Sequence, residues 1–157
     1  TLKIRTTQMK AVLQRVSKAS CEVEEKITGQ IKDGLLILLG ITHDDTQEDI
    51  KYLVEKIINM RIFREEDRHF EKSLLDTKGK ALVISQFTLF ADISKGRRPS
   101  FTNAAKPEKA EELYKKFIEE LKTNNIQTEE GVFGGMMEIE LLNSGPVTII
   151  IDSKAKK

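Results

Sequence analysis

The segment Ser85-Gln86-Phe87-Thr88 carries the densest group of side chains that could do chemistry. A hydroxyl, an amide and a second hydroxyl stand here directly after the apolar run Ala81–Ile84. Burying such polar groups without partners is costly. Two interpretations follow. The segment is a strand terminus whose polar groups are satisfied by the sheet, or it is a strand end that presents a hydroxyl, an amide and backbone N–H groups to a ligand.

A basic segment follows at Lys95-Gly96-Arg97-Arg98-Pro99-Ser100-Phe101. It combines three cations with a flexible glycine and an aromatic ring. Arg and Lys on a loop suit phosphate oxygens, which they hold through charge-assisted hydrogen bonds. The alternative is a solvated charged loop without a ligand.

The third segment is Ser144-Gly145-Pro146-Val147-Thr148, a Gly-Pro step between two β-rich stretches. An ordinary trans turn is one interpretation, because only about one X–Pro bond in twenty is cis in folded proteins. A cis bond is the functional alternative, since it can turn the neighbouring carbonyls to one side as a rigid acceptor pair for an ammonium group.

The sequence shows no other common catalytic, metal-binding or cofactor-binding motif. His43 and His69 stand in polar stretches without other ligands at metal-binding spacing, so we expect both to be free in water. Asp44-Asp45 favours the start of a helix, and Gly134-Gly135 lacks the context of a dinucleotide site. The single cysteine, Cys21, is expected to be a buried, inert thiol.

Composition indicates one ordinary domain of 157 residues with a formal net charge of +1. The chain therefore has no large positive net charge that would indicate a nucleic-acid partner. A single cysteine excludes an internal disulfide and suits a reducing cytosol. No stretch approaches the roughly 18 apolar residues needed to cross a bilayer, which argues against a membrane protein.

The ends of the chain are expected to lie outside the domain. Residues 1–8 lack the apolar run of a signal peptide, and a natural-looking start falls at Met9. We interpret 1–8 as an N-terminal extension or a remnant of expression without a functional role, 9–152 as the domain, and 153–157 as a basic tail.

Two helices are well marked. Thr46 and Asp49 resemble a capping box before a helix, and Pro107 fits the first turn of a second helix that ends at Asn124-Asn125. Apolar residues then recur at helical spacing and should face the core. They are Ile50, Leu53, Val54, Ile57 and Ile58 in the first helix, and Ala110, Leu113, Tyr114, Phe117, Ile118 and Leu121 in the second.

The remaining pattern is β-rich. The run Leu35–Leu39 has no polar alternation, which is typical of a strand buried on both faces. This pattern and the order of the elements predict an α/β fold with helices on one side and a second sheet layer on the other. The expected strands are Lys10–Val16, Ser20–Val23, Lys26–Ile31, Leu35–Leu39, Ala81–Ser85 running into Gln86–Phe90, Met136–Leu142 and Val147–Ile151.

Taken together with Met9–Val16 and Gly131–Gly134, these segments resemble the D-aminoacyl-tRNA deacylase family, once called D-tyrosyl-tRNA deacylases. The Ser-Gln-Phe-Thr segment and the late Gly-Pro step are that family's two signatures. Both occur here in order, and the resemblance runs from Met9 to about Asp152.

The resemblance implies a single three-layer α/β/β domain with mixed sheets and two main helices. It also implies a cytoplasmic homodimer with active sites at the subunit interface, and no metal or organic cofactor. The expected reaction is hydrolysis of the ester that links a D-amino acid to tRNA, or glycine mischarged on tRNA-Ala, as chirality proofreading in translation.

Residue roles carried by the resemblance fall into three groups. Ser85, Gln86, Phe87 and Thr88 would line the ester, and Ala104, Phe133 and Met137 would complete the adenosine and aminoacyl pocket. Gly145 and Pro146 would enter the partner's site through a cis bond, with Arg15 bracing them. The basic residues Lys95, Arg97 and Arg98 would contact tRNA.

In this interpretation D-side chains point to solvent, L-side chains collide with the Gly-Pro backbone, and glycine passes. Backbone N–H groups near Phe87 and Thr88 would stabilise the oxyanion. Thr88 is either a nucleophile or a structural residue beside a water oriented by the 2′-hydroxyl of tRNA, and we prefer the second. Two other classes stay open: a non-catalytic RNA-binding module and a plain dimeric interaction domain.

Overall fold

The computed structural model describes residues 7–154. Residues 1–6 of the expected N-terminal extension and residues 155–157 of the expected basic tail lie outside this range. In chain order the elements are β1 (Lys10–Val23), β2 (Lys26–Ile31), β3 (Gly34–Gly40), α1 (Gln47–Asn59), β4 (Phe63–Glu65), β5 (Arg68–Lys72), α2 (Leu74–Thr77), β6 (Lys80–Ser85), the 3₁₀ turn η1 (Phe87–Phe90), α3 (Pro107–Thr123), β7 (Thr128–Glu130) and β8 (Glu138–Asp152).

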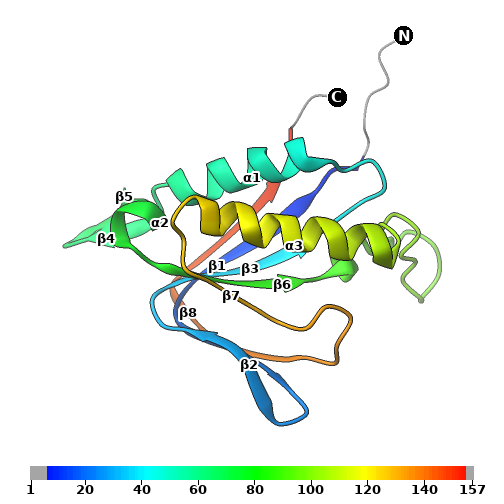
Figure 1. Ribbon diagram of the computed structural model, residues 1–157, viewed down its shortest axis with the longest axis horizontal. Helices are drawn as coiled ribbons and strands as arrows, with labels where there is room; N and C mark the ends of the chain where they lie inside the picture. Colours follow the sequence, from blue (N-terminus) through cyan, green and yellow to red (C-terminus); the bar gives the residue numbers. More distant parts are fainter. Residues whose placement is uncertain (1–6, 155–157) are drawn as a thin grey trace.

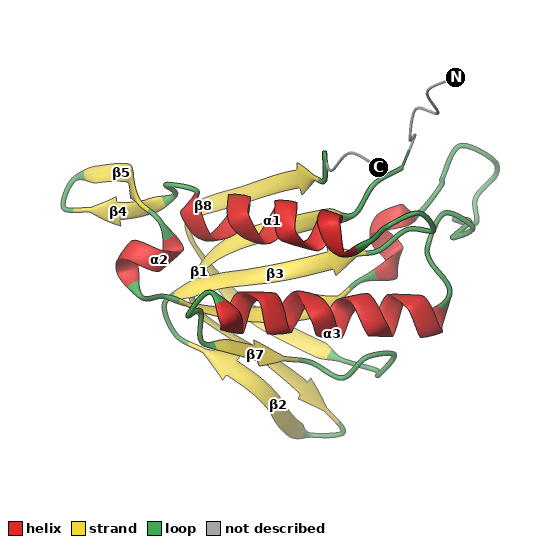
Figure 2. Ribbon diagram, turned by 45° about the horizontal axis from the view of Figure 1, so that its top comes forward, coloured by secondary structure: helices red, strands yellow, loops and turns green. Residues whose placement is uncertain are grey.

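A mixed six-stranded sheet forms the centre of the protein (Figures 1 and 2). Its order is β2-β1-β3-β6-β7, and β8 pairs with β1 along most of that strand. The β3–β6 and β6–β7 pairs are parallel, whereas β1 is antiparallel to β2, β3 and β8. Strands β4 and β5 form a separate hairpin. The mixed α/β class is therefore confirmed.

Helices α1 and α3 cover one face of the sheet (Figure 2). The predicted capping box is present, with Thr46 N–H donating to Asp49 Oδ2 at 2.8 Å. The predicted stripes face the core as expected, except that Ala110 is only partly buried. Burial of each such large apolar side chain contributes about 1.5–3 kcal/mol.

The opposite face of the sheet holds a second apolar cluster, whose buried residues all come from strands. Leu36, Leu82 and Ile84 belong to it, together with Cys21, which is a buried free thiol as predicted. Leu35, Ile37 and Leu39 point into the helix-side core instead. The run Leu35–Leu39 is apolar without alternation because β3 has a core on each face.

Three strand predictions were wrong in detail. Lys10–Val16 and Ser20–Val23 form one long strand, β1, because β8 and β2 continue the pairing. Met136–Leu142 and Val147–Ile151 are joined into β8, with an irregularity opposite Gln14 and Val16. The segment after Ser85 does not continue as a strand but turns into the 3₁₀ turn η1.

The segment between α1 and β6 was not predicted. It contains the β4–β5 hairpin and α2, a short helix that begins after Ser73. Asp76 N–H donates to Ser73 Oγ at 3.1 Å, and Ser73 N–H donates to Asp76 Oδ2 at 2.9 Å, which is a reciprocal cap.

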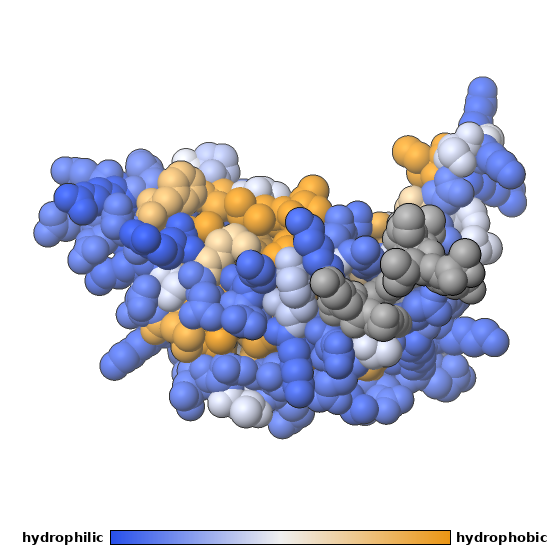
Figure 3. Space-filling view, turned by 90° about the horizontal axis from the view of Figure 1, so that it is seen from above, coloured by the Kyte–Doolittle hydropathy of each residue, from blue (hydrophilic) through white to orange (hydrophobic). Residues whose placement is uncertain are grey.

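The outer surface is mostly polar. Seen from above the view of Figure 1, the molecule is largely hydrophilic with separate apolar patches (Figure 3). Among the helices of residues 7–154, none is long and apolar enough to cross a membrane.

Candidate active site

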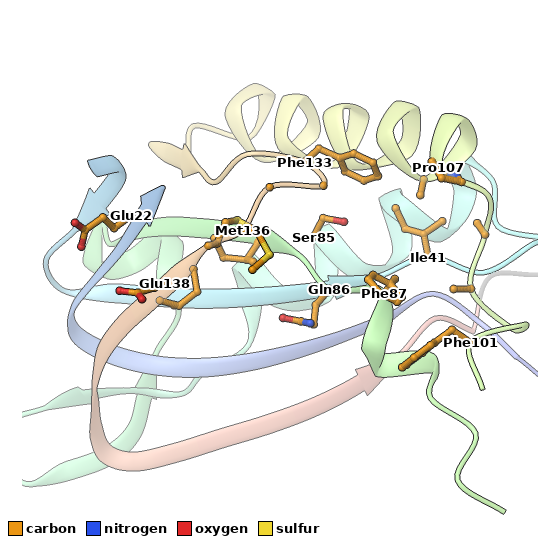
Figure 4. A pocket seen from close by; sticks show the side chains of 18 of the residues that line it. Glu22, Ile41, Ser85, Gln86, Phe87, Phe101, Pro107, Phe133, Met136 and Glu138 are labelled. Atoms are coloured by element: carbon orange, nitrogen blue, oxygen red, sulfur yellow. The ribbon is translucent and has the colours of Figure 1, made fainter. Parts of the chain in front are cut away.

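A cavity of about 1310 Å³ opens at the carboxyl end of β6, beside the start of α3. Figure 4 shows Ser85, Gln86 and Phe87 near its middle, with Phe133 on the α3 side. Glu22 and Glu138 lie toward one end, and Phe101 and Pro107 toward the other. A concave, mostly apolar cavity with a few convergent polar groups is typical of a small-molecule site.

The polar residues at the end of β6 are held by short hydrogen bonds. Gln86 N–H donates to Leu39 O at 2.8 Å, which fixes the point where β6 ends. The side-chain amide of Gln86 then donates to Thr88 Oγ1 at 2.5 Å. Thr88 does not line the cavity itself but is tied to the cavity residue Gln86 through this bond.

The 3₁₀ turn leaves two backbone donors available. Leu89 N–H donates to Gln86 O and Ala91 N–H donates to Thr88 O. Within residues 7–154, the N–H groups of Phe87 and Thr88 have no hydrogen-bond acceptor. Unpaired N–H groups at the start of a helical turn are ready donors for an anion or a developing oxyanion.

Aromatic rings form the walls of the cavity. Phe87 is 56% exposed and packs edge-to-face on Phe101, with ring centroids 5.1 Å apart. Phe133 packs against Tyr114 of α3 at 6.0 Å. Exposed rings in this arrangement offer faces on which a planar base could stack.

The Phe101 side of the cavity is held to the end of β3. Ala104 N–H donates to Phe101 O at 3.0 Å, and Ala105 N–H donates to Ile41 O at 2.9 Å. His43 is also engaged here, since its Nε2 lies 2.6 Å from Thr102 O. The prediction that His43 is free in water is therefore wrong, and His69 lies in β5 rather than in a loop.

Tyr114 connects α3 with β6. Its hydroxyl donates to Val83 O at 2.8 Å, and Gly131 N–H approaches the same oxygen at 3.4 Å. Burial, with a smaller contribution from Glu130, raises the pKa of Tyr114 far above its ordinary value, so the hydroxyl stays a donor. This bond fixes β6 two residues before Ser85.

The Gly145–Pro146 step lies elsewhere in the same chain. The peptide bond is cis, and Gly145 has φ +124°. Arg15, from the middle of β1, donates to Ser144 O at 2.9 Å and to Ile62 O at 3.0 Å. Arg15 is only 3% exposed, and its Nη2 has no hydrogen-bond partner within residues 7–154. Burial, with Arg64 nearby, lowers the pKa of Arg15.

Register shows how far apart the two motifs are. Arg15 pairs with Leu35 at one end of β3, whereas Ser85 pairs with Leu39 near the other end. Four residues of strand correspond to about 13 Å. Gly145, Pro146 and Arg15 therefore do not line the cavity of their own chain.

Three exposed basic residues lie on the loop between η1 and α3. Lys95, Arg97 and Arg98 are exposed on the loop that follows η1, and none of them has a salt bridge within residues 7–154. An isolated antiparallel β-bridge between the backbones of Asp92 and Ser100 closes this loop. Hydrogen bonds from Ser94 lower the pKa of Asp92.

The cavity also has lining residues that sequence reasoning missed, among them Glu22, Glu138, Ile41, Lys106 and Met136. Glu22 and Glu138 come together because they are paired between β1 and β8. No local motif signals such a pair, since only the strand register brings the two residues together. In the described part of the chain, no group of His, Cys, Asp and Glu has metal-binding geometry.

Of the predicted site residues, six line this cavity: Ser85, Gln86, Phe87, Ala104, Phe133 and Met137. Thr88 is joined to them through Gln86. The predicted tRNA contacts lie outside the cavity, on the loop between η1 and α3, and the Gly-Pro step with Arg15 lies at the other end of the sheet.

Known proteins resemble the chain over nearly its whole length. A family model described as D-Tyr-tRNA(Tyr) deacylase matches residues 12–152. A D-aminoacyl-tRNA deacylase from Fusobacterium nucleatum is 58% identical over 146 residues, covering 93% of this chain and 97% of that protein. A protein of the same name from Aquifex aeolicus is 52% identical, covering 93% and 99%.

Two solved structures resemble the fold. The c-Myc DNA Unwinding Element Binding Protein superimposes with a TM-score of 0.86 at 39% identity, covering 93% of this chain and 99% of that one. A probable eukaryotic D-amino acid tRNA deacylase gives a TM-score of 0.83 at 15% identity, covering 93% and 100%. At that identity the second likeness concerns the fold alone.

Proposed function

We propose, from the premise that this chain belongs to the D-Tyr-tRNA(Tyr) deacylase family and is a D-aminoacyl-tRNA deacylase, that its cavity binds the aminoacyl-adenosine end of tRNA. There the ester of a D-amino acid is hydrolysed, releasing the free amino acid and tRNA. The single observation that carries the proposal is the pair of unpaired N–H groups at Phe87 and Thr88 beside an aromatic cavity.

The cavity suits this substrate in size and chemistry. Its volume of about 1310 Å³ leaves room for a nucleoside with an attached amino acid. Stacking on an aromatic ring contributes about 1–3 kcal/mol per base, and Phe87, Phe101 and Phe133 supply rings at the cavity. The exposed cations Lys95, Arg97 and Arg98 then contact phosphates of the acceptor end.

For the chemical step, the N–H groups of Phe87 and Thr88 stabilise the negative charge that develops on the carbonyl oxygen of the ester. Thr88 Oγ1 already accepts a hydrogen bond from Gln86, but no base contacts it within residues 7–154. A threonine hydroxyl without a base is a weak nucleophile at neutral pH. We therefore assign activation of the attacking water to the 2′-hydroxyl of the terminal adenosine, and a structural role to Thr88.

A second copy of the chain completes the site. Gly145 and Pro146 lie far from Ser85 in their own chain, so they can act on an ester only in a partner. In this homodimer the carbonyls of Gly145 and Pro146 hold the substrate's ammonium group, and Arg15 braces them through Ser144. The apolar cores on both faces of the sheet support the proposed three-layer α/β/β arrangement.

Selectivity follows from this geometry. With the ammonium and the ester both fixed, a D-side chain points to solvent and an L-side chain meets the backbone at Gly145. Rejection through a collision discriminates without any contact specific to one side chain. Glycine has no side chain to reject, so we include glycine mischarged on tRNA-Ala among the substrates. The role is chirality proofreading in translation, in the cytoplasm, without a metal or organic cofactor.

Nucleic-acid binding without hydrolysis is the second candidate function. The exposed basic loop favours it, and one structural relative is named as a DNA-element binding protein. Labelled D-Tyr-tRNA, L-Tyr-tRNA and Gly-tRNA-Ala separate the two functions when incubated with the protein. Release of the D-tyrosine and glycine labels with the L-ester spared supports the deacylase. Salt-sensitive binding without any release would support the binding module and refute the proposal.

A further inference from the structure

A second cavity, of about 600 Å³, lies on the outer side of the sheet near the start of β6. Its lining includes three lysines, Lys18, Lys32 and Lys80, and a single carboxylate, that of Glu140. None of the three lysines has a salt bridge within residues 7–154. The cavity therefore carries an excess of positive charge that the described protein does not neutralise.

Lys18 and Lys80 lie in strands β1 and β6, and Lys32 lies in the bend between β2 and β3. Ala19 pairs with Ile31 between β1 and β2, and the residues directly beyond this pair are Lys18, still in β1, and Lys32, just past the end of β2. Lys80 N–H donates to Asp33 O at 3.2 Å, which holds the third lysine beside this turn.

Neutral hydrogen-bonding groups accompany the lysines. Ser20 and Gln30 are paired across the same two strands and line the same cavity. Lysine, hydroxyl and amide groups together are the side chains that contact phosphate oxygens in nucleic-acid complexes.

Its position links this cavity to the Gly-Pro step. Lys18 pairs with Leu142, which stands two residues before Ser144, so one end of the cavity lies about 7 Å along β8 from the segment Ser144–Pro146. Under the proposed function that segment enters the partner's site. That arrangement would bring the three lysines toward RNA bound in the partner's site.

We infer that Lys18, Lys32 and Lys80 form a phosphodiester-binding site for tRNA bound in the partner's active site, outside its terminal adenosine. This inference rests on the proposed function. Each tRNA is then held by both subunits, through the basic loop of one and the three lysines of the other.

The test compares two substrates. D-Tyr-tRNA carries the phosphodiester chain, whereas 2′(3′)-O-D-tyrosyl-adenosine carries none. The variant Lys18→Gln, Lys32→Gln, Lys80→Gln removes the proposed site. The matched control Lys51→Gln, Lys115→Gln, Lys122→Gln removes the same charge from exposed positions on α1 and α3. Circular dichroism and elution volume verify that both variants fold and associate like the wild type.

We expect the site variant to raise KM for D-Tyr-tRNA about tenfold at physiological salt, with unchanged kinetics on the adenosine ester. The slope of log KM against log salt should fall by roughly 2 to 3, about one for each phosphate that is no longer bound by a lysine. The control variant should behave like the wild type in the slope, apart from a small general rise in KM.

Two results would overturn the inference. One is an unchanged KM and salt slope on D-Tyr-tRNA, and the other is an equal rise in KM for the adenosine ester. Inorganic phosphate that stabilises the wild type but not the site variant, while KM for tRNA is unchanged, would assign the lysines to a free anion instead. If the wild type hydrolyses neither substrate, the proposed function fails, and the Kd of uncharged tRNA for the two variants then decides the RNA site alone.

Discussion

Substitution of Gly145 by alanine tests the Gly-Pro step more sharply than any other change. A Cβ atom at this position would lie 2.5 Å from Arg15 Nη2 and 3.1 Å from a methyl group of Val147. The residue also has φ +124°, which L-residues rarely adopt. Alanine therefore has to move both its own backbone and the guanidinium that braces it.

The cost can be worked from the hydrogen bonds of Arg15. Its guanidinium cannot shift freely, because hydrogen bonds to Ser144 O and Ile62 O hold it. Breaking one hydrogen bond of a charged group costs about 1.5–3 kcal/mol, and an unfavourable backbone conformation adds about 1–3 kcal/mol. We expect the free energy of unfolding to fall by about 2.5–6 kcal/mol, or Tm to fall by roughly 5–24 °C.

Activity should fall further than stability suggests. A displacement of about 1 Å in a positioning group can lower a rate about 100-fold. We therefore expect Gly145→Ala to hydrolyse D-Tyr-tRNA at least about 100-fold more slowly, at a temperature where circular dichroism shows it folded and sedimentation shows the same oligomer as the wild type.

Gly96→Ala is the matched control for stability. Gly96 also has a positive φ, of +67°, but a Cβ there meets no atom within 4 Å. It should cost only the backbone strain of about 1–2 kcal/mol. A folded Gly145→Ala protein with deacylation within about twofold of the wild type would refute the role given to the Gly-Pro step, since a displaced positioning group should slow the reaction far more.

Three further changes test other parts of the structure. Thr88→Ala should retain at least about a tenth of the wild-type kcat in single-turnover deacylation, whereas a loss on the order of 10³-fold with intact binding would make Thr88 the nucleophile. Tyr114→Phe should lower the free energy of unfolding by about 1 kcal/mol in urea, because Val83 O loses its 2.8 Å donor; an unchanged midpoint would contradict this. Ser73→Ala should cost about 1 kcal/mol at neutral pH. Because hydrogen bonds from Ser73 lower the pKa of Asp76 in the folded state, the cap stabilises above the ordinary carboxyl pKa and is lost as the pH falls through the lowered one. NMR titration should find the pKa of Asp76 raised in the variant, and the stability difference should shrink below about pH 4.

Local sequence patterns were sufficient to predict the two main helices and the central strand β3. The cap at Thr46 and the apolar stripe from Ile50 to Ile58 depend only on neighbours three or four residues away. Likewise, Leu35–Leu39 indicates a doubly buried strand by composition alone. The Ser85–Thr88 segment was recognised as chemical from its residue types, and the structure places three of its four residues at the cavity.

The sequence could not predict which strand segments join into one continuous strand. The β1 strand extends through Ser17 and Lys18 because β8 supplies partners across a register shift, which no local pattern encodes. The hairpin β4–β5 was missed because Phe63–Glu65 is too short and polar to show alternation. The 3₁₀ turn at Phe87 depends on Gln86 N–H pairing with Leu39 O, a hydrogen bond between distant segments.

The sequence by itself determined the residue types of the site, the two helices and the family to which the chain belongs. Only the tertiary structure decided which of those residues share a cavity. Arg15 and Gly145 lie about 130 positions apart in the chain but are in contact, whereas Gly145 and Ser85 are separated by the length of β3. The physical reason is that helix caps and apolar periodicity act over a few residues, while strand register is set by the burial of whole faces of a sheet.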